Sequence, residues 1–424
     1  LPSLLRARSR VKRSRGAHDA DYLPLMRQGS SRLRGLFRAE EGENRLQTAA
    51  QASRGYFQEL ATGSSRYGVG LGIVAALLVV LGARDLFTGE IPVLREFVDA
   101  GSSASALLAQ WWSGWREPGM GEQAVAPGIV PGLGVLGTVL FGSVGLARRL
   151  LVLAPLFVGA IGAWKLFVHQ GSMRARAAML AAYGLNPVVL NAVAEGRLQA
   201  LFVYGAAPWV LRRVARGAAV EPFVDAESPT PPRLRLVAGI ALALALVAAV
   251  TPLGAAVLVV TIVAMALVVV LGGERAAGAR MLTLVGAGTL MAVPVVLPWL
   301  VAAVIDGDAA TLTGLWTGRG EVPSATELIT GSVGPVTVGL FGWGLLVAGA
   351  YALASGRSWR LRWAVAGWVV SFAAWIVTIV LATSDTLAGA GPELFLMPAV
   401  LGLAVSVAMG AFAFEHDVIG SDFG

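Results

Sequence analysis

Long apolar runs alternate with short polar segments along most of the chain beyond residue 66. The clearest pair is "LVAGIALALALVAAV" at 236–250, followed by "LGAAVLVVTIVAMALVVVLGG" at 253–273. A helix of about 20 apolar residues crosses a hydrocarbon core of roughly 30 Å. The runs lack the alternation of apolar and polar residues that marks a transmembrane β-barrel. The pattern therefore predicts an all-α, polytopic membrane protein of about ten transmembrane helices.

Besides the ten predicted spans, one further apolar run is too short to cross. That run, "PGLGVLGTVLFG" at 131–142, would rise only about 18 Å as a helix. We expect an interfacial helix region there, on the outer side, within a first extracytoplasmic loop at 84–149. The predicted spans are residues 67–83, 150–167, 175–194, 198–211, 236–250, 253–271, 281–304, 334–354, 363–382 and 394–414.

The distribution of charge orients these spans. Only 14% of residues are charged, and residues 1–66 hold 13 Lys and Arg against 6 Asp and Glu. Cytoplasmic loops carry an excess of Lys and Arg. With residues 1–66 inside, the loops at 165–176, 212–235, 272–280 and 355–362 are also inside, and all four are net basic. The sequence thus predicts a multi-pass protein of the plasma membrane with a cytoplasmic N-terminus.

Residues 1–66 are interpreted as a basic cytoplasmic linker, followed by a multi-span membrane domain at 67–424. The linker is either solvated or contacts anionic lipid headgroups through short amphipathic helices. Because a membrane tether explains its charge, we expect no nucleic-acid partner. The chain begins at Leu1 rather than Met, so we expect a fragment that follows a missing N-terminal domain. There is no cysteine, which excludes disulfides and thiolate metal sites, and the three histidines are far apart.

Polar residues gather where the third and fourth predicted spans meet. The stretch "LNPVVLNAVAEGRLQA" at 185–200 contains Asn191, Glu195 and Arg197, and Pro187 should end or kink the helix. We expect Glu195 and Arg197 to face the outer surface. The first outer loop adds Asp85 and Glu90, directly after the first span, and Arg116 in "LLAQWWSGWREPGMG". The tryptophans of this motif fit either a membrane anchor or a platform for a sugar ring.

The layout resembles membrane glycosyltransferases of the GT-C type. Residues 67–216 in particular are similar to the membrane region of actinobacterial proteins that carry an N-terminal, family 2-type GT-A glycosyltransferase domain. The motifs behind this resemblance are "WWSGWREPGMG", "GLNPVVLNAVAEGR" and "VYGAAPWVLRRVAR". The resemblance implies transfer of a sugar from a polyprenyl-phosphate donor to a glycan acceptor at the outer face, during cell-envelope polysaccharide assembly.

The resemblance also implies roles for the outer polar residues. Asp85 or Glu90 would be the catalytic base for the acceptor hydroxyl. Arg197 or Arg116 would hold the phosphate, and Glu195 and Asn191 would complete the substrate-binding site. No metal ligands or cofactors are predicted, although a divalent metal could take the place of an arginine at the phosphate.

Three alternatives to this enzyme remain open. Glu195 and Arg197 could simply cap a hairpin in the headgroup layer. The whole region could be a non-catalytic scaffold that anchors a cytoplasmic GT-A domain, or a flippase for lipid-linked sugars. A proton- or ion-coupled transporter is disfavoured because no Asp, Glu, Lys or Arg falls in the middle of a predicted span.

Overall fold

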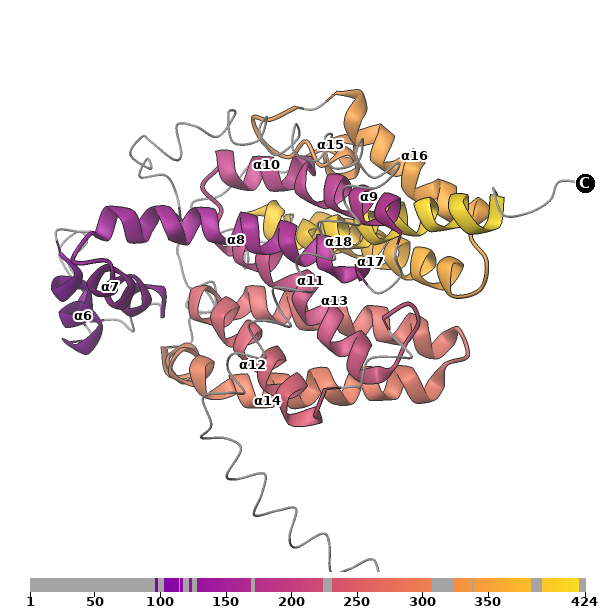
Figure 1. Ribbon diagram of the computed structural model, residues 1–424. Helices are drawn as coiled ribbons and strands as arrows, with labels where there is room; N and C mark the ends of the chain where they lie inside the picture. Colours follow the sequence, from indigo (N-terminus) through magenta and orange to yellow (C-terminus); the bar gives the residue numbers. More distant parts are fainter. Residues whose placement is uncertain are drawn as a thin grey trace, which may run out of the picture. The chain divides into compact units, whose positions relative to one another are not determined.

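The computed structural model describes residues 96–97, 103–113, 115–116, 122–123, 128–168, 172–223, 231–306, 323–337, 339–382 and 391–418. Helices form nearly all of this part of the chain (Figure 1), and the exception is one antiparallel pair of two-residue strands. The elements are α6 (Ala104–Ser113), β1 (Trp115–Arg116), β2 (Glu122–Gln123), α7 (Ile129–Val139), α8 (Val144–Leu166), α9 (Met173–Gly184), α10 (Pro187–Ala194), α11 (Leu198–Ala218), α12 (Arg233–Val250), α13 (Pro252–Leu271), α14 (Arg275–Asp306), α15 (Ala325–Thr330), α16 (Leu340–Ser355), α17 (Ser358–Ala382), α18 (Pro392–Ala413) and a final π-helical turn (Phe414–Val418).

Among the described residues, seven helical segments are long and apolar enough to cross a membrane. The prediction of an all-α, multi-pass membrane protein is therefore confirmed at this level. The predicted span at 67–83 lies outside the described residues. The remaining two fall short because α16 has only 16 residues and α11 carries three arginines towards its end. The seven segments are Val144–Leu166, Met173–Ala194, Arg233–Val250, Pro252–Leu271, Arg275–Pro294, Ser358–Leu381 and Pro392–His416.

Helix α18 is the central element of the described bundle. Nearly all of its residues are buried, and it packs against α9, α10, α11, α16 and α17. Its closest neighbour is α17, because Gly367 and Gly402 bring the two backbones together so closely that a Cβ on either would overlap the carbonyl oxygen of the other. Small residues at such crossings allow tight helix packing in membranes. Buried Ser406 donates to the Ala364 carbonyl across the same contact, at 3.1 Å.

The predicted span at 175–194 is broken into two helices, as expected from Pro187. Asn186 accepts a hydrogen bond from the Val188 N–H at 3.1 Å and so caps α10, and Pro187 occupies the first turn. The preceding helix, α9, packs on α11 through Tyr183, whose ring stacks on that of Tyr204 with centroids 4.4 Å apart. The break leaves the polar hairpin residues at the end of α10 and the start of α11.

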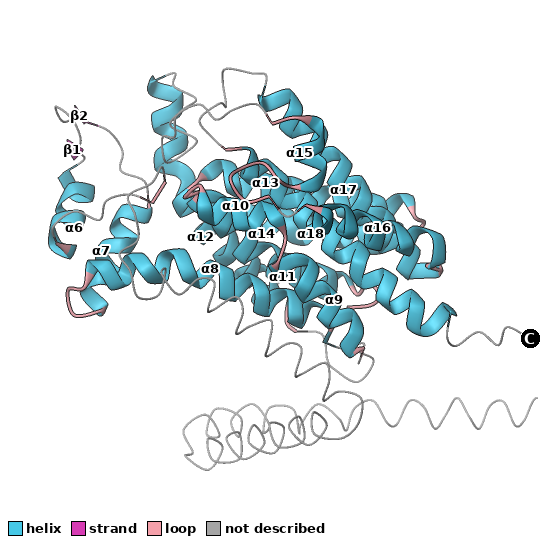
Figure 2. Cartoon of the chain, turned by 90° about the horizontal axis from the view of Figure 1, so that it is seen from above, coloured by secondary structure: helices cyan, strands magenta, loops and turns pink. Residues whose placement is uncertain are grey.

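The segment before α8 forms a small helical layer. Helix α7 packs against α6 and against the start of α8, and β1 and β2 follow α6 (Figure 2). Eleven residues make α7 only about 16 Å long, so it is a short helix as predicted for 131–142. Its position at the membrane surface stays a prediction. Helix α8 begins at Val144, six residues before the predicted start at 150, so Arg148 and Arg149 lie within the helix rather than in the loop before it.

Candidate functional site

The turn between α10 and α11 is tight because a glycine reverses the chain. Gly196 has φ of +67°, a left-handed conformation that glycine adopts without steric cost. Glu195 is the C-cap residue of α10, and the Arg197 N–H donates to the Ala192 carbonyl at 2.7 Å. Glu195 remains half-buried, whereas the Arg197 side chain turns inward.

Arg197 is buried between two carboxylates that come from distant parts of the sequence. Its Nη1 lies 3.8 Å from Glu96 Oε1, and its Nε lies 3.4 Å from Glu393 Oε2. The side chains are only 3% exposed for Arg197 and 1% for each glutamate. The expectation that Arg197 faces the outer surface is therefore wrong. The reason is electrostatic: a guanidinium can be buried where carboxylates compensate its charge.

Backbone contacts hold the first-loop carboxylate in this cluster. The Gln199 N–H donates to Glu96 Oε2 at 2.8 Å, and the Glu96 N–H donates to the Gly196 carbonyl at 3.2 Å. On the other side, Arg148 of α8 donates to the Phe97 carbonyl at 2.9 Å. The segment at Glu96 and Phe97 is thus fastened both to the α10–α11 turn and to α8. This contact also gives Arg148, a basic residue on the predicted outer side, a partner in the first loop.

The charges of this cluster bear on the phosphate role expected for Arg197. Two glutamates and one arginine carry a formal net charge of −1, so these three groups together offer a phosphate no excess of positive charge. Glu96, Arg197 and Glu393 instead join three segments: the first loop, the α10–α11 turn and the start of α18. We call these three residues the Arg197 cluster. Arg197 in this arrangement positions the segments around it.

Asn191 is also committed to contacts within the chain. It is fully buried, its Nδ2 donates to the carbonyls of Gly331 and Val336 at 3.3 and 3.0 Å, and its Oδ1 accepts from the Val336 N–H at 2.8 Å. Both donor hydrogens and the acceptor of an amide are used in this way. The side chain that was expected to bind substrate therefore holds the segment between α15 and α16 against α10.

Helix α15, which leads into that segment, has its own polar cap. Ser324 and Glu327 form a capping box, in which the Ser324 N–H donates to the Glu327 carboxylate at 2.7 Å. This hydrogen bond to the ionised carboxylate lowers the pKa of Glu327 from its ordinary value. The helix ends at Thr330, and the carbonyl of its C-cap residue, Gly331, accepts the hydrogen bond from Asn191.

The remaining predicted site residues are not part of the described cluster. Asp85 and Glu90 lie outside the described residues. Arg116 belongs to β1, where its Cα pairs with that of Glu122 in β2. Within the described ranges, no group of three or more histidines and carboxylates is placed to hold a metal ion.

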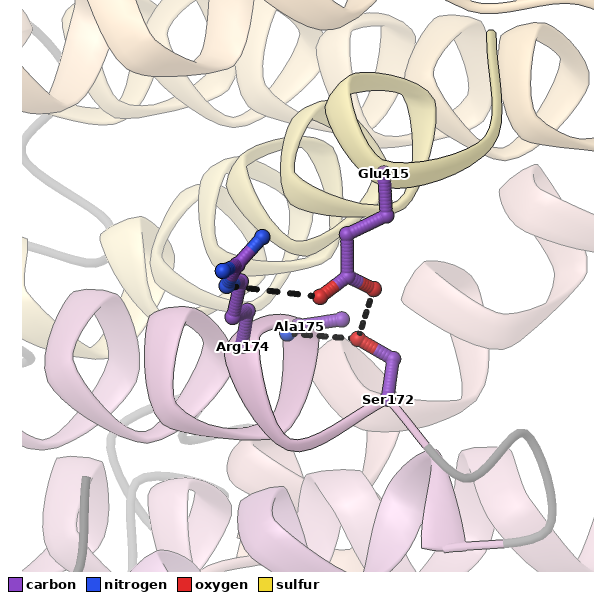
Figure 3. Close-up of polar contacts among 4 residues, drawn as sticks. All are labelled: Ser172, Arg174, Ala175 and Glu415. Carbon is purple, nitrogen blue, oxygen red and sulfur yellow. Dashed lines mark hydrogen bonds and ion pairs between the residues drawn. The ribbon is translucent and has the colours of Figure 1, made fainter. Parts of the chain in front are cut away.

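A second polar cluster lies at the opposite end of α18 (Figure 3). Ser172 accepts from the Ala175 N–H at 3.1 Å, which caps α9, and donates to Glu415 Oε2 at 2.5 Å. Arg174 Nε lies 3.7 Å from Glu415 Oε1. Because the positive end of a helix dipole favours an anion, the Glu415 carboxylate is well placed at the start of α9. It fastens the C-terminal end of α18 to α9.

The sequence indicated the contacts of the Arg197 cluster only in part. Glu96 and Glu393 both stand in predicted outer segments, as does Arg197, and a buried arginine needs acids from somewhere. Nothing in the sequence indicated which of the many outer acids would reach it.

No family model, curated protein or solved structure matches the chain.

Proposed function

We propose that the chain is the membrane region of a GT-C-type glycosyltransferase that uses a polyprenyl-phosphate-linked sugar at the outer face of the plasma membrane. The observation that supports this proposal is the contact of Glu96 with Arg197 and Gln199. It brings the first predicted outer loop onto the turn between α10 and α11, next to half-buried Glu195. A catalytic carboxylate in the first loop needs such an approach to the other membrane helices.

The proposed chemistry needs few groups. Asp85 or Glu90 accepts the proton of the acceptor hydroxyl while its oxygen forms a bond to the anomeric carbon of the sugar. The bond between that carbon and the phosphate oxygen breaks, and its electron pair leaves with the polyprenyl phosphate. Arg116 stabilises the leaving phosphate, and Glu195 binds an acceptor hydroxyl. The Arg197 cluster positions the first loop instead of contacting the phosphate.

The proposed orientation completes this assignment. The N-terminus and the linker at 1–66 are cytoplasmic, ten helices cross the bilayer, and α6 and α7 lie at the outer surface. Trp112 of α6 is 84% exposed, and Phe141, directly after α7, is also exposed. Tryptophan favours the headgroup layer, so exposed Trp112 supports an interfacial position for these helices.

The test is transfer by the full-length protein in proteoliposomes, with a panel of polyprenyl-phosphate hexoses and pentoses as donors. Removing the catalytic base by Asp85→Asn or Glu90→Gln should lower turnover by roughly 100-fold or more. The control is Arg275→Gln, at an exposed position at the start of α14. Unchanged turnover in the double variant Asp85→Asn, Glu90→Gln would reject the catalytic role.

A second candidate is a non-catalytic scaffold for a cytoplasmic GT-A domain. The observation that favours it is the pairing of Arg197 with two buried glutamates. Such ion pairs would join the three segments in a non-catalytic membrane region as well as in an enzyme. In this case the same double variant retains full transfer, because the reaction takes place on the cytoplasmic domain.

A further inference from the structure

One indole ring, that of Trp209 in α11, has two cationic side chains from different helices beside it. Lys165 Nζ, in the last turn of α8, lies 5.7 Å from the ring centroid, and Arg213 Cζ lies 5.8 Å from it. Both distances lie within the range of a cation–π contact. Cationic groups that share one ring repel each other, so the arrangement favours an anion beside them.

The Trp209 ring is held firmly in place. Its Nε1 donates to the Val158 carbonyl of α8 at 2.9 Å, and α8 comes so close at Gly162 that an added Cβ would overlap Pro208 and Trp209. Arg213 lies against Gly239 of α12, where a Cβ would overlap its guanidinium. The ring and the Arg213 side chain therefore occupy defined places between neighbouring helices.

A third basic residue lies at the same end of these helices. Arg235 is exposed in the first turn of α12, one helical turn before Gly239 and on the same face. Because Gly239 contacts Arg213, Arg235 belongs to the same end of the bundle as Lys165 and Arg213. We call Lys165, Arg213, Arg235 and Trp209 the basic collar. The sequences of α8, α11 and α12 contain no Asp or Glu that could neutralise it.

An exposed apolar surface leads away from the basic collar along two helices. On α8, Phe157 and Ile161 are exposed and share one face with Lys165, at intervals of four residues. On α12, exposed Leu242 and Leu246 share the face of Arg235. Cationic groups at the end of an apolar, lipid-facing surface match a molecule that has an anionic head and hydrocarbon chains.

We propose that the basic collar binds the headgroup of an anionic bilayer phospholipid, whose acyl chains lie along α8 and α12. The phosphate contacts Lys165 and Arg213, and Arg235 adds a third charge at the rim. Trp209 orients both cations and borders the headgroup layer, where indole rings are favoured. Basic pockets between membrane helices recognise anionic headgroups in this way. This binding site is independent of the proposed transfer reaction.

The experiment is native mass spectrometry of the purified chain, titrated with phosphatidylglycerol or phosphatidylcholine of identical acyl chains. The wild type should retain phosphatidylglycerol preferentially. The double variant Lys165→Gln, Arg213→Gln should retain it about tenfold less well, since each basic side chain contributes to the attraction. The matched control is Arg360→Gln, which removes a cation 5.1 Å from a single tryptophan, Trp359, and should leave retention unchanged.

The same experiment separates other sources of phosphate. Glycerol phosphate added in excess should not displace the lipid, because it lacks acyl chains. Polyprenyl phosphate should compete more weakly than phosphatidylglycerol. Effective competition by either compound, or equal retention of phosphatidylglycerol by wild type and variant, overturns the proposal. If the double variant does not fold, the single variant Lys165→Gln serves, because that side chain is exposed and should still lower retention measurably.

Discussion

Arg197 Nε lies 3.4 Å from Glu393 Oε2, although helices α11 to α17 separate the two residues in the sequence. This ion pair fastens the start of α18 to the turn after α10. At the other end, Glu415 fastens the chain after α18 to Ser172, at the start of α9. Helix α18 therefore runs antiparallel to the broken helix α9–α10, with a carboxylate contact at each end.

The first prediction concerns the central place of Arg197 in its cluster. Arg197→Met removes the ion pairs with both Glu96 and Glu393, and breaking a buried ion pair should cost about 3–5 kcal/mol of stability. Glu393→Gln removes one of the two pairs and keeps Arg197 beside Glu96, so its cost should be clearly smaller. Thermal unfolding in detergent, followed by tryptophan fluorescence, measures both. An equal or larger loss of Tm in Glu393→Gln would contradict this view of the cluster.

The second prediction concerns Asn191. Asn191→Leu removes three hydrogen bonds and leaves polar backbone groups of Gly331 and Val336 without this partner, at a cost of about 1–3 kcal/mol for each buried group that stays unsatisfied. Hydrogen exchange of the peptide that covers residues 331–337 should become faster. Asn191→Asp keeps the oxygen that accepts from the Val336 N–H, so the exchange of that one amide should remain slower than in Asn191→Leu. Unchanged exchange in Asn191→Leu would show that the contact does not order the segment.

Hydropathy and helix-ending residues predicted much of the fold. The apolar runs at 236–250 and 253–271 correspond to α12 and α13 within a few residues, because lipid allows few alternatives to a continuous helix. Pro187 predicted the break between α9 and α10 for a local steric reason. The start of α8 was missed because Arg148 and Arg149 lower the local hydropathy, although the helix carries them and Arg148 bonds to the first loop.

The contacts of the site were harder to predict from the sequence than the helices, because they join residues far apart in the chain. Arg197 was selected as an outer cation, but its two carboxylates come from before α6 and from the start of α18. Which of many outer acids meets Arg197 depends on how the helices pack, and the apolar pattern carries no such information. Asn191 was selected for its polarity within an apolar stretch. In the folded chain, the Asn191 amide instead forms hydrogen bonds with the backbone of Gly331 and Val336.

The third prediction concerns the crossing of α17 and α18. Gly402→Ala places a methyl group against the Gly367 carbonyl oxygen, so the helices must separate, at a cost of about 1–3 kcal/mol. Gly286→Ala in α14 is the matched control because a Cβ there meets no atom within 4 Å. The control should be neutral or slightly stabilising, since alanine favours a helix over glycine. The Tm of Gly402→Ala should therefore fall while that of Gly286→Ala stays the same or rises slightly, and equal Tm values would show that the crossing tolerates a wider separation.

The last prediction concerns orientation, and the absence of cysteine makes it direct to test. Ser105 of α6 and Ala276 of α14 are both exposed, and the loop charges predict that they lie on opposite sides of the membrane. In intact cells, a membrane-impermeant thiol reagent should label Ser105→Cys and leave Ala276→Cys unlabelled. Both should react after the cells are permeabilised, which controls for local accessibility. Labelling of Ala276→Cys alone in intact cells would invert the topology and move Glu195 and the Arg197 cluster to the cytoplasmic side, where an acceptor at the outer face could not reach them.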